Sequence, residues 1–409
     1  MKWFVDIARV FRREMSLIVS DMGVMIFFVL LPLAYPIVYT LIYNPEVVRD
    51  VPVVVVDDSR TPQSRELVRQ ASAAPAFSLY GYASDLTEAK RLWAEHQVYA
   101  IMHIPSDYAK DIARGEQAHV TMFCDMSLLL RYRSLLSAMT SLQIKLAEDI
   151  TEERVELYAG ALTGMAGLPV ESENHFLGDT QQGFASFVIP GIVVLILQQS
   201  MLLGIGMLGG TSRERRRANG GIDPLEVQDA STFSTVWGKT LAYIVFYIVP
   251  TMFLLRYIPI IFNLPHHGDP VDYLLFIFPM VVASAFLGQA LVAIIKEREY
   301  VFLYIVFTSV VFLFLSGLTW PRYAMSRFWL AVGNLVPATH GVEGFIRINS
   351  NAATLYDNKD TFVALWILSG IYFVLAMIVT WWLRRQGRAV AKASAQRSPS
   401  IAADTMPPA

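Results

Sequence analysis

The chain has 409 residues, of which 54% are hydrophobic and 12% aromatic, and this composition excludes an ordinary soluble protein. It indicates an integral membrane protein. The formal net charge of −2 comes from nearly equal numbers of acids and bases, and no charged tract suggests a nucleic-acid partner. The single cysteine, Cys124, excludes an intrachain disulfide and a cysteine-based metal cluster.

Residues 1–21 are predicted to form an amphipathic cytoplasmic helix that lies along the inner membrane surface. Apolar residues recur on one side at helical spacing, while Arg9, Arg12 and Arg13 fall on the other. No small-residue cleavage site follows the first apolar run, which indicates an uncleaved anchor rather than a removable signal peptide. A merely basic membrane flank is the alternative for this segment.

Six apolar stretches are long enough to cross about 30 Å of hydrocarbon as helices. They are residues 22–43, 184–209, 241–262, 273–295, 301–320 and 362–383. Pro321 and Pro337 interrupt the sequence after the fifth stretch, which predicts a partly re-entrant outer hairpin near 320–350. Residues 184–383 are thus predicted to form a five-helix transmembrane domain, followed by a disordered cytoplasmic tail at 384–409.

Lysine and arginine concentrate before the first stretch, between the second and third, between the fourth and fifth, and after the sixth. Because short cytoplasmic loops are enriched in these residues, both termini are expected inside. The predicted fold class is therefore an α-helical polytopic membrane protein with six transmembrane helices, both termini inside, and an inserted α/β extracytoplasmic domain.

The inserted domain is expected at residues 44–183, between the first and second stretches. Strands are predicted at 51–56, 77–80, 98–104 and 119–124, with helices between them and a long C-terminal helix from 127 to about 159. Strands that alternate with helices indicate a small α/β sheet. Its histidines and carboxylates fall on different elements without ligand spacing, so neither a metal site nor a catalytic pair is predicted.

Nucleotide chemistry is not expected in this chain. Gly238-Lys239-Thr240 matches the end of a phosphate-binding loop, but Phe233 stands where the motif requires glycine. No catalytic or cofactor-binding residue is assigned, and the chain is not expected to be an enzyme. Three polar residues within the spans, Gln198, Gln199 and Gln289, could line a pathway or bond helices together, and the sequence leaves both alternatives open.

The order and spacing of several short motifs resemble the permease subunit of type-2 ATP-binding cassette (ABC) exporters, in the subfamily with a large outer domain between the first two spans. The motifs are 51–58 (VPVVVVDD), 98–108 (VYAIMHIPSDY), 314–321 (FLSGLTWP) and 335–339 (LVPAT), with Gly344-Phe345 downstream. The resemblance covers almost the whole chain up to about Arg388.

The resemblance implies that two permeases pair, as a homodimer or heterodimer, and that a separate ABC ATPase subunit binds ATP and docks on the inner face. Docking would use the N-terminal helix and the loop between the second and third spans. The residues expected to take part are Arg9, Arg12, Arg13, Arg213, Glu214, Arg215, Arg216 and Arg217.

The expected function is export of a lipophilic, drug-like or lipid-linked substrate from the cytoplasm or inner leaflet across a bacterial inner membrane. A periplasmic adaptor of the membrane-fusion type is a further candidate partner. The alternatives are a non-transporting receptor or scaffold of the phage-infection-protein type and, more remotely, an intramembrane enzyme.

Overall fold

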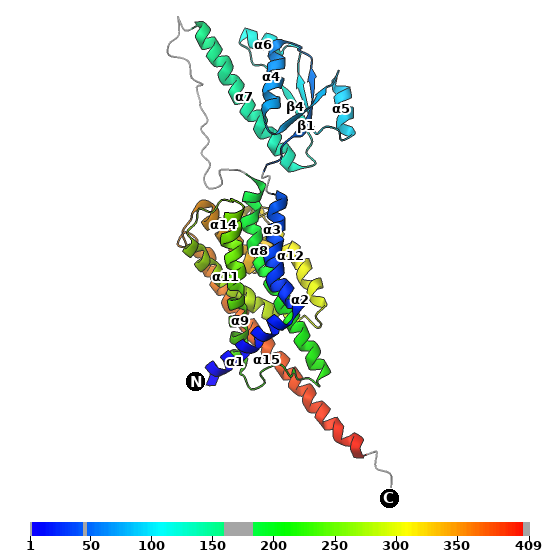
Figure 1. Ribbon diagram of the computed structural model, residues 1–409, viewed down its shortest axis with the longest axis vertical. Coiled ribbons are helices and arrows are strands. Elements are labelled where there is room, and N and C mark those ends of the chain that lie inside the picture. The colour runs from blue at the N-terminus through cyan, green and yellow to red at the C-terminus, as the bar shows by residue number, and fades with distance from the viewer. Residues whose placement is uncertain (1, 44–46, 159–182, 404–409) are drawn as a thin grey trace. The chain divides into compact units, whose positions relative to one another are not determined.

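The chain folds into two compact units, which a computed structural model describes over residues 2–43, 47–158 and 183–403. Residues 47–158 form a unit that contains a β-sheet, while residues 2–43 and 183–403 together form a helical unit (Figure 1). The sheet unit therefore falls, in sequence, between the first and second long apolar helices.

The sheet unit alternates strands and helices, as the sequence predicted. Its elements are β1 (Val51–Asp57), α4 (Pro62–Ala73), β2 (Phe77–Tyr82), α5 (Leu86–Ala94), β3 (Ala100–Ile104), α6 (Tyr108–Arg114), β4 (Thr121–Cys124) and α7 (Leu129–Tyr158). The strand order is β2-β1-β3-β4, in which β1 runs parallel to both neighbours and β4 runs antiparallel to β3.

Strand β1 is central because its valines are buried on both faces of the sheet. On one face, Val53 and Val55 share an apolar cluster with Leu67 of α4 and with residues of α7. On the other face, Val54 packs in a second cluster with Ala89 of α5. Helices thus cover both faces, which is the arrangement that parallel strands require.

The helical unit is built from apolar helices and shorter connecting helices. They are α1 (Lys2–Ser20), α2 (Met22–Met25), α3 (Leu31–Tyr43), α8 (Phe184–Ala218), α9 (Thr232–Met252), α10 (Ile258–Ile261), α11 (Pro270–Leu291), α12 (Phe307–Leu315), α13 (Arg327–Gly333), α14 (Pro337–Asn351) and α15 (Lys359–Ala403). Short π-helical segments at Ile26–Leu30, Phe253–Tyr257 and Phe302–Val306 and a 3₁₀ turn at Arg322–Ala324 complete the unit.

Five helices of the described chain are long and apolar enough to cross a membrane, one fewer than the sequence predicted. They are Met22–Tyr43, Phe184–Ala218, Thr232–Ile261, Pro270–Leu291 and Lys359–Ala393. The stretch predicted at 301–320 is instead helical over Phe302–Leu315, about 21 Å at roughly 1.5 Å per residue, which is short of a bilayer core. It ends because Gly317 takes a left-handed φ of +89° and Pro321 follows.

Residues 384–403 also differ from the predicted disordered tail, because α15 continues from the last apolar stretch to Ala403 without a break. Arg384 fixes the start of this extension: its side chain is 9% exposed and pairs with Glu226 at 2.8 Å. The alanine-rich sequence that follows favours helix. Residues 404–409 of the predicted tail lie outside the described residues.

The first apolar helix crosses α8 closely at Gly204. A Cβ atom on Gly204 would lie 1.9 Å from a ring atom of Phe28. The Phe28 ring is fully buried and meets the Tyr247 ring edge-on, with 5.2 Å between centroids. Glycine is therefore required here by the close approach of a neighbouring aromatic side chain.

Candidate functional site: a charged network at one end of the helical unit

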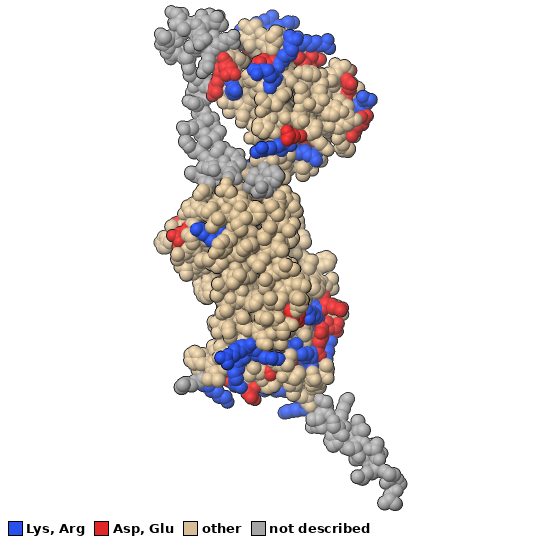
Figure 2. All heavy atoms as spheres, in the orientation of Figure 1, with Lys and Arg blue, Asp and Glu red and all other residues tan. Residues whose placement is uncertain are grey.

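The predicted docking residues 213–217 belong to the C-terminal end of α8 rather than to a loop, since α8 runs unbroken from the apolar stretch to Ala218. Gly220 and Gly221 then reverse the chain with φ of +61° and +98°, the region that glycine adopts readily. Residues 219–231, called here the α8–α9 segment, return along the end of α8. Figure 2 shows Lys and Arg gathered near this end of the helical unit, beside a broad band without charged side chains on the visible face.

Asp223 anchors the α8–α9 segment to α8. Its carboxylate accepts two hydrogen bonds from Arg215, at 2.9 and 3.0 Å, and one from the Ser212 hydroxyl at 2.6 Å. Burial by itself raises the pKa of Asp223, but the hydrogen bonds from Arg215 and Ser212 outweigh burial and leave that pKa below its usual value. Asp223 is therefore ionised at neutral pH and holds the segment in place.

Glu226 joins three elements. Its carboxylate pairs with Arg216 of α8 and, at 2.8 Å, with Arg384 of α15. The Glu226 side chain is 11% exposed, that of Arg216 is 16% exposed and that of Arg384 is 9% exposed. Burial raises the pKa of Glu226, but the positive charges of Arg216 and Arg384 bring it below the ordinary value. Arg384 also donates to the backbone carbonyls of Val227 and Ala230, so α15 is fastened to the α8–α9 segment at several points.

The other charged residues near the end of α8 bind the chain that follows α11. Arg213 donates from one nitrogen to three backbone carbonyls within residues 292–295, at 2.8 to 3.1 Å. Glu214 accepts the backbone amide of Arg298 at 2.7 Å. Arg217 pairs with Glu297 at 2.8 Å, and both side chains are about half exposed. Most of this predicted docking cluster thus binds its own chain, and Arg217 is its most exposed member.

Helix α1 packs against α9 through a face that contains two acids. Its buried residues, Asp6, Val10, Glu14 and Ile18, recur every four residues. Glu14 accepts a hydrogen bond from the Tyr243 hydroxyl and lies 3.6 Å from the amine of Lys239, both on α9. The predicted amphipathic helix is present, but charged hydrogen bonds as well as apolar contacts fix it to the bundle.

The three predicted docking arginines of α1 make different contacts. Arg9 pairs with Asp6 of the same helix, and the Arg12 side chain is exposed. Arg13 donates from Nε to the backbone carbonyl of Leu225, in the α8–α9 segment, at 3.0 Å. This last contact joins the two predicted docking elements into one continuous surface.

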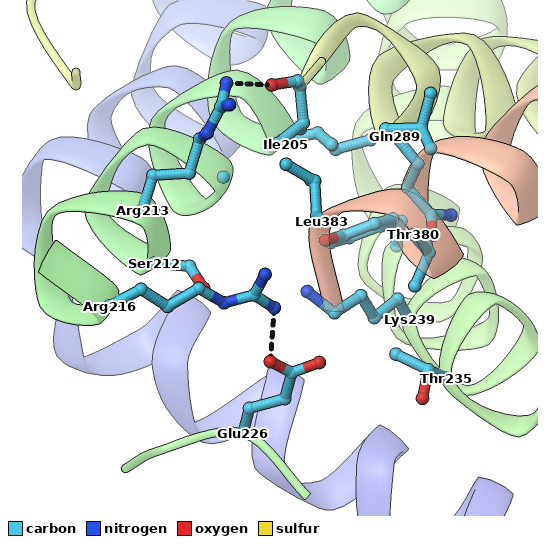
Figure 3. A pocket seen from close by; sticks show the side chains of 14 residues that line it. Ile205, Ser212, Arg213, Arg216, Glu226, Thr235, Lys239, Gln289, Thr380 and Leu383 are labelled. Carbon is cyan, nitrogen blue, oxygen red and sulfur yellow. Dashed lines mark hydrogen bonds and ion pairs between the residues drawn. The ribbon is translucent and has the colours of Figure 1, made fainter. Parts of the chain in front are cut away.

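A small cavity with both polar and apolar lining lies among α8, α9, α11 and α15 (Figure 3). Its charged and polar lining includes Arg213, Arg216, Glu226, Lys239 and Gln289. Figure 3 shows Arg216 reaching Glu226, with the amine of Lys239 directed toward the same region. The cavity measures about 50 Å³, which is room for a few water molecules and too little for a drug-sized ligand.

The three glutamines predicted within the spans are all buried, but they have different partners. Gln198 accepts the backbone amide of Ala338 at 2.7 Å, in the first turn of α14, which has no side-chain cap from its own N-cap residue. Gln289 donates to the hydroxyl of Thr240 at 2.7 Å. Gln199 is 9% exposed, and neither of its side-chain polar atoms has a hydrogen-bond partner among the described residues. Gln198 and Gln289 thus bond neighbouring elements, although Gln198 Nε2 and Gln289 Oε1 have no partner among the described residues, and all three glutamines remain candidates for a pathway.

The sequence-based search for site residues missed Glu14, Asp223, Glu226 and Arg384. A signal for two of them was present: Asp223 and Glu226 follow five charged residues across a Gly-Gly turn, and clustered arginines need nearby counter-charges when they are buried. Glu14 lies four residues after the apolar Val10, on the side of α1 that packs. Nothing local marks Arg384, because its partner is far away in sequence.

These apolar helices, with charges gathered near one end, define a polytopic membrane protein. The family model described as ABC-2 family transporter protein matches residues 22–379, and the chain therefore belongs to this family. The match confirms the resemblance found in the sequence. Among curated proteins, ABC transporter G family member 20 of Dictyostelium discoideum is 27% identical over 210 residues, which cover 49% of this chain. The chain spans 27% of the length of that relative.

Proposed function

We propose that this chain is the transmembrane permease subunit of an ABC exporter, which moves a lipophilic, drug-like or lipid-linked substrate outward while a separate ATPase subunit hydrolyses ATP. Family membership supports the ATPase partner and pairing of two permeases. The observation that carries the proposal is the continuous surface made by α1 and the α8–α9 segment, where Arg13 meets Leu225. Because α1 is also fastened to α9 through Glu14, a force applied to this surface would reach the apolar helices.

In the proposed topology the chain crosses a bacterial inner membrane six times, with both termini and the charged network in the cytoplasm and the sheet unit outside. The short Phe302–Leu315 helix makes the fifth crossing together with the residues after it. Leu315, Ser316 and Leu318 are buried in protein, and non-helical backbone is tolerated at membrane depth in such surroundings. Helices α13 and α14 then form the re-entrant hairpin.

The number of crossings can be tested with a reporter enzyme that is active on one side of the membrane only. An even number of crossings places reporters fused at the two ends of the chain on the same side. Signals from opposite sides would instead mean that Phe302–Leu315 does not cross, and would overturn the six-span topology.

Docking of the ATPase on this surface is tested by reversing the charge of a residue that makes no contact needed for folding. Arg12 is exposed, whereas Arg215 and Arg216 bind Asp223 and Glu226 and would perturb the fold if changed. We expect Arg12→Glu to weaken association with the ATPase, identified by pull-down from native membranes, and to lower its vanadate-sensitive turnover about tenfold, which corresponds to about 1.4 kcal/mol.

The matched control is Arg327→Glu, an exposed arginine on the side predicted to face outward. It should leave both association and turnover unchanged. Equal effects of the two variants would contradict the docking surface. Wild-type protein that binds no ATPase at all would contradict the exporter proposal and favour a non-transporting receptor or scaffold.

A further inference from the structure

A groove of about 530 Å³ runs between α15 and the start of α9. Trp381, Arg385, Arg388 and Lys392 line it from α15, and residues 231–232 line it at the start of α9. No Asp or Glu is among its lining residues. The groove is therefore strongly positive, and its volume suits a small polar ligand or headgroup.

Three of the four basic residues that line the groove, Arg385, Arg388 and Lys392, form no ion pair with the part of the chain that the structure describes. Arg385, Arg388 and Lys392 are three and four residues apart, so they lie on one face of α15, where like charges repel. Between residues 361 and 403 the sequence contains no acid. Arg384 also lines the groove, but its guanidinium already binds Glu226 and backbone carbonyls. The three exposed cations are thus arranged so that an external anion would relieve their repulsion.

The position of the groove favours a membrane lipid as the source of that anion. Trp381 and Trp382 are exposed near the end of the last apolar stretch, and tryptophan at such a place marks the membrane interface. The guanidinium of Arg385 lies 5.3 Å from the centre of the Trp381 ring. From Trp381 to Arg388 the helix rises about 10 Å, which places the basic stripe at the level of the headgroups and just beyond.

We propose that this groove binds the phosphate headgroup of an anionic phospholipid from the leaflet on the side of the charged network. The headgroup would lie against Arg385 and Arg388, close to the positive end of the α9 helix dipole. Bound there, the lipid would bridge α15 and α9. The inference rests on the membrane location that the family establishes, not on export, so it can fail or hold independently of the proposed function.

The test uses the full-length protein in detergent, titrated with phosphatidylglycerol or phosphatidylcholine while native mass spectrometry counts bound lipid. We expect wild-type protein to prefer phosphatidylglycerol. In the double variant Arg385→Gln/Arg388→Gln, affinity for phosphatidylglycerol should fall about 30-fold, since each basic residue near an anionic surface contributes about fivefold. Affinity for phosphatidylcholine should not change.

Two further variants control for charge and folding. Arg385→Lys/Arg388→Lys keeps the charge and should retain most of the preference. Lys110→Gln/Arg114→Gln removes two exposed charges from α6 in the sheet unit and should have no effect.

Three outcomes would overturn the assignment. One is equal binding of the two lipids by the wild-type protein, a measurement that needs no variant. Another is an unchanged affinity for phosphatidylglycerol in the double glutamine variant. If that variant keeps its lipid affinity but loses ATPase binding, the groove is a protein-docking surface instead. The last is inorganic phosphate binding as tightly as the lipid, which would mean that the membrane is not the source of the anion.

Discussion

Removal of the charge on Glu226 should loosen the end of the helical unit that holds the charged network. The variant Glu226→Gln keeps the size of the side chain and one acceptor oxygen, but leaves Arg216 and Arg384 without their shared counter-charge. Both arginines are largely buried, at 16% and 9% exposure, so water can replace the lost carboxylate only in part. The change therefore isolates the electrostatic contribution of Glu226.

Breaking a buried ion pair by removing one partner typically costs about 3–5 kcal/mol. For a folded unit of this size, a loss of that order lowers the melting temperature by about 6–10 °C. The matched control is Glu297→Gln, whose pair with Arg217 is about half exposed on both sides. An exposed pair contributes about 0–1 kcal/mol, so the control should melt within about 2 °C of the wild type.

Thermal unfolding of the purified full-length protein, followed by the helical circular dichroism signal at one scan rate, measures both variants. A fixed scan rate matters because unfolding of membrane proteins is commonly irreversible. If Glu226→Gln melts no lower than Glu297→Gln, the buried arginines do not depend on Glu226, and the argument that this carboxylate holds three elements together is wrong.

The same structure predicts three further outcomes of stability measurements. The pKa of Glu226 in the folded protein is lowered from 4.5, so the stability that its charge contributes is complete above pH 4.5 and is lost as the pH falls below that value. Melting curves of the wild type and of Glu226→Gln should therefore converge in acid. A difference that stays constant with pH would contradict this. Gln198→Leu should lose about 1–3 kcal/mol by leaving the Ala338 amide unpaired, whereas Gln199→Leu should lose none, because no bond is broken there. Gly204→Ala should cost about 1–3 kcal/mol through contact with Phe28, and Phe28→Leu should recover part of that loss; additive losses would exclude the contact.

Much of the fold could be predicted because its signals are local. The valine run of β1 is buried on both faces and bounded by turn residues, so a central strand follows from the sequence alone. Long apolar stretches likewise predict spans. The fifth apolar stretch has the length of a span, but the helix in it is shorter, because the chain around Gly317 leaves the helix before the apolar residues end.

The candidate site was predicted less completely, because it depends on pairs that are distant in sequence. The arginines of α8 were found from their clustering, but not their partners, since Arg384 is 158 residues from Glu226. Whether a buried glutamine finds a hydrogen-bond partner also depends on its tertiary neighbours: Gln198 Oε1 accepts the Ala338 amide, whereas the adjacent Gln199 has no partner among the described residues. Charge type is readable from sequence, whereas the pairing of charges is not.

The continuation of α15 past the membrane-length stretch changes how a shortened version of this protein should be designed. A deletion after Leu383 would remove Arg384 and with it the bonds to Glu226, Val227 and Ala230. A deletion that begins after Gly387 would keep those bonds and also the close approach of the Gly387 backbone to Gly221. The two deletions differ by four residues, yet the structure predicts that the first removes the bonds that fasten α15 to the α8–α9 segment, leaving Glu226 paired with Arg216 alone, and that the second keeps them.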